Sequence, residues 1–365
     1  MNRVDVAVVG AGVTGLAVAR ELRTRGVAVA VVEREGIGAG ASGVQPGGVR
    51  QQWGTRVACR LARESVAFWR EADSRLDARL KLSFSACGYL FAAEKAATLA
   101  RLAANVALQN DEGIPSRIVH SGEIAELVPS LDSEPIVGGA WCGEDGYFDR
   151  PQAVVEAFAA GLQVEHAAVD AIVRDGGGWT VGPVAADAVV IAAGVETTRL
   201  LAPLGIELPI EAEERYLFFS DAIRERLLEP LVVVPERGFA AKQLADGRVL
   251  ASDLAARGDE VEGRARWRAT IRNATEALLP RLAHVSYPLL VRGVYDMTPD
   301  HQPILGPVGD GIFVAAGFSG HGFMIAPAVA RVVADAVEGH EDPVLDILGV
   351  ERFAEGRLVP EPQLV

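Results

Sequence analysis

The chain is poor in the features that mark membrane, nucleic-acid-binding and disulfide-stabilised proteins. In its 365 residues no apolar run reaches the roughly 18 residues of a membrane span. The net charge of −14 argues against nucleic acid or an anionic membrane as a partner, since both require basic patches. Three cysteines, far apart and odd in number, predict neither a disulfide framework nor a CxxC pair. Strand-like residues begin at Val4, which leaves no room for a secretory signal, so we expect a cytoplasmic protein.

Metal and nucleophilic chemistry are also without a sequence signature. The six histidines fall at no ligand spacing such as HExxH, so no metal is predicted. Half of the residues are apolar and 23% are charged, as in an ordinary globular protein long enough for two domains. The expected partners are therefore small molecules.

A glycine turn between a strand and a helix is the first positive signal. The segment "VDVAVVGAGVTGLAVARELRTRGVAVAVVERE" predicts a buried strand, a helix over 13–25 and a second strand over 27–32. Gly10 allows the tight turn, Gly12 lets the backbone approach a pyrophosphate, and Gly15 lets the helix pack on the strand. Phosphates are expected at the helix N-terminus. Glu33 ends the second strand, where an acid can accept hydrogen bonds from ribose hydroxyls.

Two further glycine-bearing strand ends and a long glycine-rich loop indicate a large cofactor. Residues 36–48, within "GIGAGASGVQPGGVRQQW", hold six glycines, and "DAVVIAAGVET" runs from a buried strand into Ala-Ala-Gly. The last of the three glycine-bearing strand ends is "GFSGHGFMIAP", residues 317–327, which follows the strand "GIFVAA". Strand ends of this kind, spread over more than 300 residues, favour FAD, which is long enough to cross the sheet.

These motifs together resemble the D-amino-acid-oxidase-like (DAO) FAD oxidoreductases. The residues that carry the resemblance are GAGVTG with Glu33, the GASG…GGVRQQ loop, AAG, "YDMTPDHQPILG" and "GFSGHGFMIAP". The nearest branch contains sarcosine oxidase, dimethylglycine dehydrogenase and the β subunit of dye-linked L-proline dehydrogenase. The likeness runs from Val4 to about Val337 and is thin between about 90 and 290.

The resemblance implies a discontinuous α/β flavin domain with a Rossmann-like fold and an α+β substrate domain with an antiparallel sheet. We expect the flavin domain over 1–85, 136–205 and 286–345, the substrate domain over 86–135 and 206–285, and a C-terminal tail over 346–365. Strand-like runs at 87–93, 215–221, 231–235 and 247–253 suit that sheet. Helices are predicted over 95–110 and 260–282.

The expected cofactor contacts come from the motifs and from the family's binding mode. The segment matching 320–323 lies over the isoalloxazine ring in this family, and a helix expected near Ile325, with Pro327 in its first turn, would add its dipole. The predicted FAD-binding residues are Gly10, Ala11, Gly12, Val13, Thr14, Gly15, Glu33, Arg34, Ala41, Ser42, Gly43, Gly47, Gly48, Val169, Ala193, Gly194, Gly320, His321, Gly322, Phe323 and Met324.

Arg50 and His321 are the predicted catalytic residues. Family members place a carboxylate-binding arginine near Arg50, and a guanidinium can orient an amino acid by a bidentate pair. The open alternative is a solvated arginine or one paired with the flavin. His321 is expected near the flavin and could donate or move a proton, or be only a packed loop residue.

Departures from the family pattern bear on the flavin linkage and the electron acceptor. Gly293 stands where monomeric sarcosine oxidase has a flavin-linking cysteine, so the FAD is expected to be noncovalent. Met324 replaces a carboxylate-binding lysine, and Val249 an oxygen-activating one, although Lys242 could approach the flavin instead. Electrons would pass to O2 or to another acceptor.

The expected reaction is hydride transfer from a secondary or N-methyl amino acid, of the sarcosine or proline type, to flavin N5, giving an imine. The alternatives are an oxidase or dehydrogenase of D-amino acids, glycine or a specialised amine. A third alternative is a flavin-binding subunit or assembly factor with little turnover of its own, since relatives occur in multi-subunit complexes.

Overall fold

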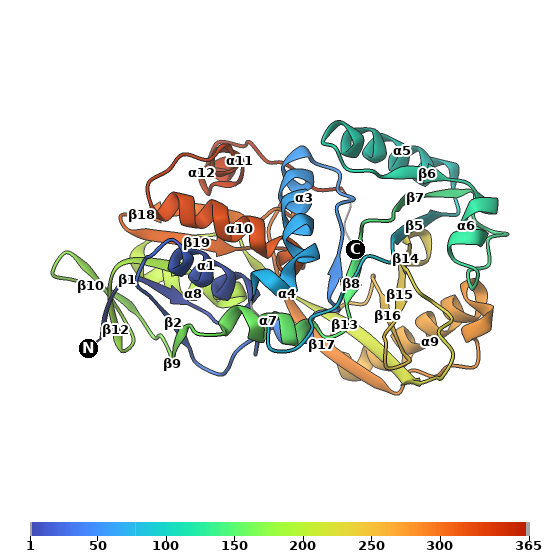
Figure 1. Ribbon diagram of the computed structural model, residues 1–365, viewed down its shortest axis with the longest axis horizontal. Coiled ribbons are helices and arrows are strands. Elements are labelled where there is room, and N and C mark those ends of the chain that lie inside the picture. Colours follow the sequence, from blue (N-terminus) through green and yellow to red (C-terminus); the bar gives the residue numbers. More distant parts are fainter. Residues whose placement is uncertain (1, 77, 363–365) are drawn as a thin grey trace.

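The computed structural model describes residues 2–76 and 78–362, and its two large sheets lie side by side (Figure 1). The first sheet has the order β10-β11-β12-β1-β2-β9, with β19 on β12 and β18 on β19. Its strands are β1 (Asn2–Val9), β2 (Val29–Glu33), β9 (Gln163–His166), β10 (Ile172–Asp175), β11 (Gly178–Val181), β12 (Val184–Ile191), β18 (Ile304–Gly309) and β19 (Ile312–Ala316).

The centre of this sheet is parallel and almost wholly apolar. In β1, Val8 lies opposite Val31 of β2 and Val190 of β12, and all three are fully buried. Strands covered on both faces need such continuous apolar runs. Helix α1 (Val13–Thr24) packs on α10 (Gly322–Val337), and α10 in turn packs on α3 (Arg56–Arg70) (Figure 1).

The second sheet has the order β17-β13-β16-β15-β14-β5-β7-β6. It is antiparallel, as expected, except that β14 pairs with β5 in parallel. Its strands are β5 (Tyr89–Ala93), β6 (Arg117–Val119), β7 (Gly138–Cys142), β13 (Glu211–Ala222), β14 (Leu231–Val234), β15 (Phe239–Gln243), β16 (Arg248–Asp253) and β17 (Leu289–Met297).

Helices expected over 95–110 and 260–282 are present and cover the second sheet. They are α5 (Ala96–Asp111), which packs on β5, β6 and β7, and α9 (Glu260–Leu278), which packs on β16. Trp267 of α9 stacks on Tyr216 of β13 with ring centroids 4.2 Å apart. Because an aromatic pair buries large apolar areas, it fixes α9 on the sheet.

A small third sheet lies between the two large ones (Figure 1). Strand β8 (Gly146–Phe148) pairs with β3 (Gly48–Val49) and with β4 (Phe84–Ser85). The shorter helices are α2 (Ala41–Val44), α4 (Ala72–Arg75), α6 (Ser121–Leu127), α7 (Pro151–Ala159), α8 (Thr197–Leu201), α11 (Pro343–Leu348) and α12 (Glu351–Ala354).

Sheet membership moves two of the expected domain boundaries. Strand β7 starts two residues after the expected boundary at 136 but pairs with β5 and β6. Strand β17 follows the boundary at 286 but pairs with β13 over nine residues. By hydrogen bonding, both strands belong to the second sheet, because strand pairing follows partners that lie far away in sequence. The division into two domains is otherwise retained as a proposal.

The expected C-terminal tail is docked on the flavin domain as far as the structure describes it. Arg352 of α12 and Asp300 are both fully buried and form a bidentate pair, with N–O distances of 2.8 and 3.0 Å. The backbone N–H of Glu361 donates to Asp300, and the Glu361 carboxylate accepts from Gly54 and Thr55. The segment therefore ties the 298–302 turn to the loop that follows β3.

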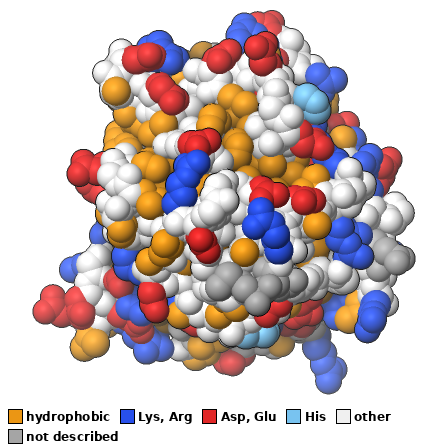
Figure 2. All heavy atoms as spheres, turned by 90° about the vertical axis from the view of Figure 1, so that its left-hand side faces the viewer, with side chains coloured by type: hydrophobic (Ala, Val, Ile, Leu, Met, Phe, Trp, Pro, Cys, Tyr) orange, Lys and Arg blue, Asp and Glu red, His pale blue; other side chains and the backbone are white. Residues whose placement is uncertain are grey.

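Charges of both signs are interspersed on the end of the molecule formed by the first sheet, and apolar side chains surface between them (Figure 2). Among the described residues no helix has the length and apolar character to cross a bilayer.

Replacing Arg352 by Met is expected to lower the free energy of unfolding by about 3–5 kcal/mol. The change leaves the Asp300 carboxylate buried without its partner. Urea unfolding of the protein measures the loss. Arg357→Met, which removes an exposed arginine bound to Glu355, is the control and should cost less than about 1 kcal/mol. Equal losses in the two variants would contradict the prediction.

Candidate active site

The glycine turn after β1 is shaped by close backbone contacts. Gly10 has φ +105°, and a Cβ on it would lie 2.4 Å from the carbonyl oxygen of Ala192, beyond the end of β12. A Cβ on Gly15 would lie 2.1 Å from the carbonyl oxygen of Gly10. Both positions therefore require glycine. The contacts hold the N-terminus of α1 at the carboxyl edge of the sheet, where its first N–H groups and its dipole favour phosphate.

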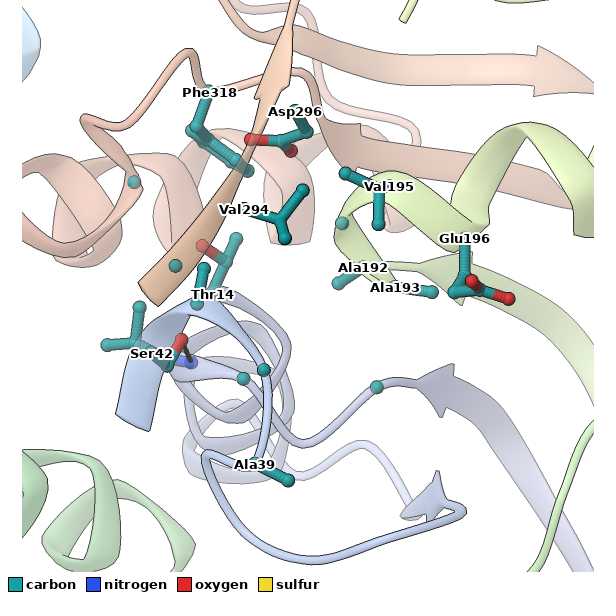
Figure 3. A pocket seen from close by; sticks show the side chains of 18 of the residues that line it. Thr14, Ala39, Ser42, Ala192, Ala193, Val195, Glu196, Val294, Asp296 and Phe318 are labelled. Carbon is teal, nitrogen blue, oxygen red and sulfur yellow. Dashed lines mark hydrogen bonds between the residues drawn. The ribbon is translucent and has the colours of Figure 1, made fainter. Parts of the chain in front are cut away.

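Two side chains complete this turn. Glu33, at the end of β2, accepts from the N–H of Ala11 at 2.8 Å through one oxygen and from the N–H of Glu35 at 2.8 Å through the other. Ser42 of α2 accepts from the N–H of Val13 at 2.9 Å, so the glycine-rich loop lies against the start of α1 (Figure 3). An anchored acid at this position is suited to hold ribose hydroxyls.

A cavity of about 620 Å³ opens from this turn and continues to the second sheet. Figure 3 shows its middle, where Thr14 and Ser42 lie below Val294, Asp296 and Phe318. Of the predicted cofactor residues, those that line it are Gly10, Gly12, Val13, Thr14, Glu33, Arg34, Ala41, Ser42, Val169, Ala193, Gly194, Gly320, Gly322 and Phe323.

The other predicted cofactor residues lie just outside the cavity wall. Gly15 and Gly43 pack against backbone carbonyls, at Gly10 and Gly38, and Gly47 lies against that of Phe148. The carbonyl of Met324 accepts from the indole of Trp69 at 2.9 Å. The predicted cofactor residues that do not line the cavity are Ala11, Gly15, Gly43, Gly47, Gly48, His321 and Met324.

Asp296 and Tyr295 of β17 support the glycine loop 317–322. The Asp296 carboxylate accepts from the N–H of Gly317 at 2.7 Å, and burial raises the pKa of this carboxyl to about 6. A Cβ on Gly320, which has φ +87°, would lie 2.2 Å from the Tyr295 ring. The "YDMTPDHQPILG" and "GFSGHGFMIAP" motifs are therefore in direct contact.

Helix α10 begins at Gly322, earlier than expected, with its N-terminus at the cavity. Pro327 is its sixth residue and not in its first turn, which corrects that expectation. The helix continues through the proline because it is buried between α1 and α3, where packing outweighs one lost backbone hydrogen bond.

Arg50 and His321, 271 positions apart, are brought together around Trp53. The Arg50 guanidinium carbon lies 3.8 Å from the centroid of the Trp53 ring, and the His321 ring packs edge-on at 4.4 Å. Their exposed fractions are only 1% and 5%, and neither lines the cavity. Burial and the charge of Arg50 hold the pKa of His321 well below its usual value, so its imidazole is neutral. No described residue is hydrogen bonded to its Nε2.

Asp145, which the sequence did not suggest, anchors the Arg50 loop. This carboxylate is fully buried and accepts from the backbone and side-chain N–H groups of Gln51 and from the side chain of Gln52. Burial raises its pKa to about 6. No sequence motif marks it, since its partners lie 93 and 94 positions away.

Lys242 does not line the cavity. It is 1% exposed, and its Nζ lies 4.0 Å from the centroid of the Tyr147 ring and 3.5 Å from the Phe148 carbonyl oxygen. Burial lowers its pKa to about 7. The expectation that it could approach the flavin finds no support in this position.

The second sheet contributes further cavity residues. They come from β13, β16, the residue after β16, and β17, and of these only Tyr295 and Asp296 belong to the quoted motif "YDMTPDHQPILG". The set is Arg215, Leu217, Ser252, Leu254, Arg292, Gly293, Val294, Tyr295 and Asp296. Alternation along β13 could have suggested Arg215 and Leu217 as neighbours on one face.

By its site alone, the protein is of the dinucleotide-binding α/β class with a second domain over the cofactor cavity. More specifically, the chain belongs to the DAO family of FAD dependent oxidoreductases, whose family model matches residues 5–336. It is 28% identical to glycine oxidase of Geobacillus kaustophilus, covering 93% of this chain and 94% of that protein. It is 27% identical to sarcosine oxidase subunit beta of Rhodobacter capsulatus, and the match covers 99% of this chain and 91% of that protein. The structure of L-proline dehydrogenase from P. horikoshii superposes with a TM-score of 0.89 at 26% identity, covering 98% and 100%.

FAD is therefore the cofactor, and the cavity fits it. The turn at Gly10 and Gly15 admits no side chain, and Glu33 stands beside it with both oxygens anchored. No cysteine or histidine of the described chain lines the cavity.

Gly10→Ala is expected to remove most of the bound FAD. The new Cβ would meet the Ala192 carbonyl, and φ +105° is strained for alanine. The ratio of visible to ultraviolet absorbance of the purified protein measures the FAD content. Gly122→Ala, in α6 with nothing within 4 Å of the new Cβ, is the control and should keep its FAD. Retention of FAD by both variants would contradict the assignment of the turn.

Asp145 is expected to make stability fall as pH rises. Its carboxyl titrates near 3.8 when unfolded and near 6 when folded, so between these values the folded state holds more protons. The free energy of unfolding should therefore drop by up to about 3 kcal/mol from pH 4 to pH 6. Urea unfolding at pH 4, 5, 6 and 7 should give a smaller slope for Asp145→Asn. Glu144→Gln, at the exposed neighbour, should keep the wild-type slope; the same slope in all three proteins would refute the assignment.

Proposed function

We propose that the protein oxidises the C–N bond of a secondary or N-methyl amino acid, of the sarcosine or proline type. The observation that carries the proposal is the continuous cavity, which extends from the nucleotide turn at Gly10 to residues of the second sheet. There it is lined by apolar Leu217 and Leu254 and by two arginines, the largely buried Arg215 and the exposed Arg292. A small acid with an apolar body suits such a lining.

The comparisons support this substrate class without selecting a substrate. The structure named L-proline dehydrogenase matches over its whole length, and sarcosine oxidase subunit beta matches over 91% of its length. The likeness to glycine oxidase favours a primary amino acid as the second candidate. The name of the sarcosine oxidase relative also supports the possibility of partner subunits, and with it the third candidate, a flavin-binding subunit with little turnover of its own.

When bound, FAD supplies the acceptor for the hydride that leaves the carbon next to the amine nitrogen. The resulting imine is hydrolysed by water. The chain's own contribution is to bind and orient. In our proposal, backbone N–H groups at Gly320, Gly322 and Phe323 and the N-terminus of α10, which lie at the cavity, would help to hold the flavin and would stabilise negative charge on it. Noncovalent binding is proposed, since Gly293 stands at the expected attachment position.

Arg50 and His321 are proposed to act at the substrate end from behind the cavity wall. Arg50 is a fixed positive charge packed on Trp53. His321 is neutral, and because its pKa is held well below its usual value it is a weak base, so its proposed part is to form a hydrogen bond near the substrate amine and not to hold the amine's proton. Both side chains pack on Trp53 and neither lines the cavity, so direct contact of either one with the substrate requires a rearrangement of the cavity wall.

Anaerobic reduction of the FAD-loaded protein tests the proposal. L-Proline and sarcosine are expected to bleach the visible flavin absorbance, and glycine and D-amino acids to do so slowly or not at all. Dithionite is the control for a reducible flavin, and readmitted air distinguishes O2 from another acceptor. Bleaching by glycine or D-alanine alone would move the assignment to the second candidate. Bleaching by dithionite but by none of the amines would overturn it.

A further inference from the structure

Strand β13 places an arginine, Arg215, on the wall of the cavity. Arg215 lies opposite Gly293 of β17, and Glu213 lies opposite Tyr295. Because side chains alternate along a strand, Glu213, Arg215 and Leu217 share one face, and Arg215 and Leu217 line the cavity. The Arg215 side chain is 18% exposed, so its guanidinium is largely withdrawn from bulk water.

Arg215 and the glycine loop meet at one aromatic ring. The guanidinium carbon of Arg215 lies 5.2 Å from the centroid of the Tyr295 ring, within the range of a cation–π contact. The same ring packs against the backbone of Gly320, so closely that its Cε2 would lie 2.2 Å from any Cβ added there. Arg215 is thus separated by a single ring from the loop proposed to lie over the flavin.

The charges around Arg215 leave room for an anion. Arg215 and Arg257 both contact the carboxylate of Glu213, so two guanidiniums share that one acid. Burial and the neighbouring Arg257 lower the pKa of Arg215 to about 10, which leaves it charged at neutral pH. Arg292 differs, because it is 55% exposed and has Glu214 as its partner.

We propose that Arg215 binds the carboxylate of the substrate, the role expected from the sequence for Arg50. The inference rests on the proposed function and names the residue that recognises the acid. A guanidinium on a rigid strand can hold a carboxylate by two parallel hydrogen bonds and so fix the direction of the carbon to be oxidised. Glu213 is then the internal carboxylate that competes with the substrate for Arg215.

Calorimetric titration of the FAD-loaded protein with cyclopentanecarboxylate tests the assignment. This acid has the ring and carboxylate of proline but no C–N bond, so binding is measured without turnover. Arg215→Gln is expected to weaken it roughly ten- to hundredfold, the worth of a charged hydrogen-bonded pair. Glu213→Gln is expected to tighten it several-fold by removing the competitor. Cyclopentanecarboxamide, the neutral analogue, should respond to neither change.

Arg248→Gln is the matched control, since it removes the same charge from the adjacent strand β16, where Arg248 binds Asp246. It should leave the dissociation constant within about twofold of the wild-type value. Loss of carboxylate binding in Arg50→Gln but not in Arg215→Gln would overturn the assignment. Loss of FAD from Arg215→Gln would also overturn it, because Arg215 would then serve the cofactor. If Arg215→Gln does not fold, Glu213→Gln decides alone, and unchanged binding there refutes the proposal.

The outcome is independent of the amine assay. Binding of cyclopentanecarboxylate that depends on Arg215, in a protein that no amine reduces, would support an acid site and reject the proposed oxidation. Reduction by proline or sarcosine with binding independent of Arg215 would support the function and reject this residue.

Discussion

The close approach of Gly10 to the Ala192 carbonyl is the contact on which the cofactor site depends. Strands β1 and β12 run side by side to Val9 and Ile191, and the N–H of Ala192 donates to Val9 at 2.9 Å. The segments that follow β1 and β12 must both turn away at the same edge of the sheet, and any side chain at Gly10 would force these two segments apart. Because they turn together, α1 starts at the cavity and Glu33 reaches the N–H of Ala11.

The substrate side of the site has a different foundation, a loop held by distant elements. In the loop after β3, the Trp53 carbonyl accepts a hydrogen bond from the side-chain N–H of Gln109 of α5 at 2.8 Å. In the same loop, the backbone N–H of Gln51 donates to the Asp145 carboxylate, and the backbone N–H of Gly54 donates to the Glu361 carboxylate. Three segments of the chain thus fix one short loop. This explains how Arg50, an isolated charge in sequence, becomes fully enclosed.

The cavity belongs to both sheets, and β17 connects them. This strand pairs with β13 in the second sheet, yet Asp296 near its end holds Gly317 of the loop that follows β19. Movement of one sheet relative to the other would therefore disturb the flavin loop and the Arg215 wall together. The family resemblance of its motif assigned β17 to the flavin domain, whereas its hydrogen bonds place it in the second sheet.

The sequence by itself determined the nucleotide turn, the central strands of the first sheet and the helices α1, α5 and α9, and the resemblance of its motifs indicated the FAD family. Those features depend on local rules, such as glycine where φ is positive and apolar runs in buried strands, which neighbouring residues reveal. Only the tertiary structure decided that Arg50 and Lys242 are enclosed, that Asp145 anchors a loop and that Arg215 lines the cavity. The physical reason is that burial and charge balance come from residues far away in sequence, which no local pattern records.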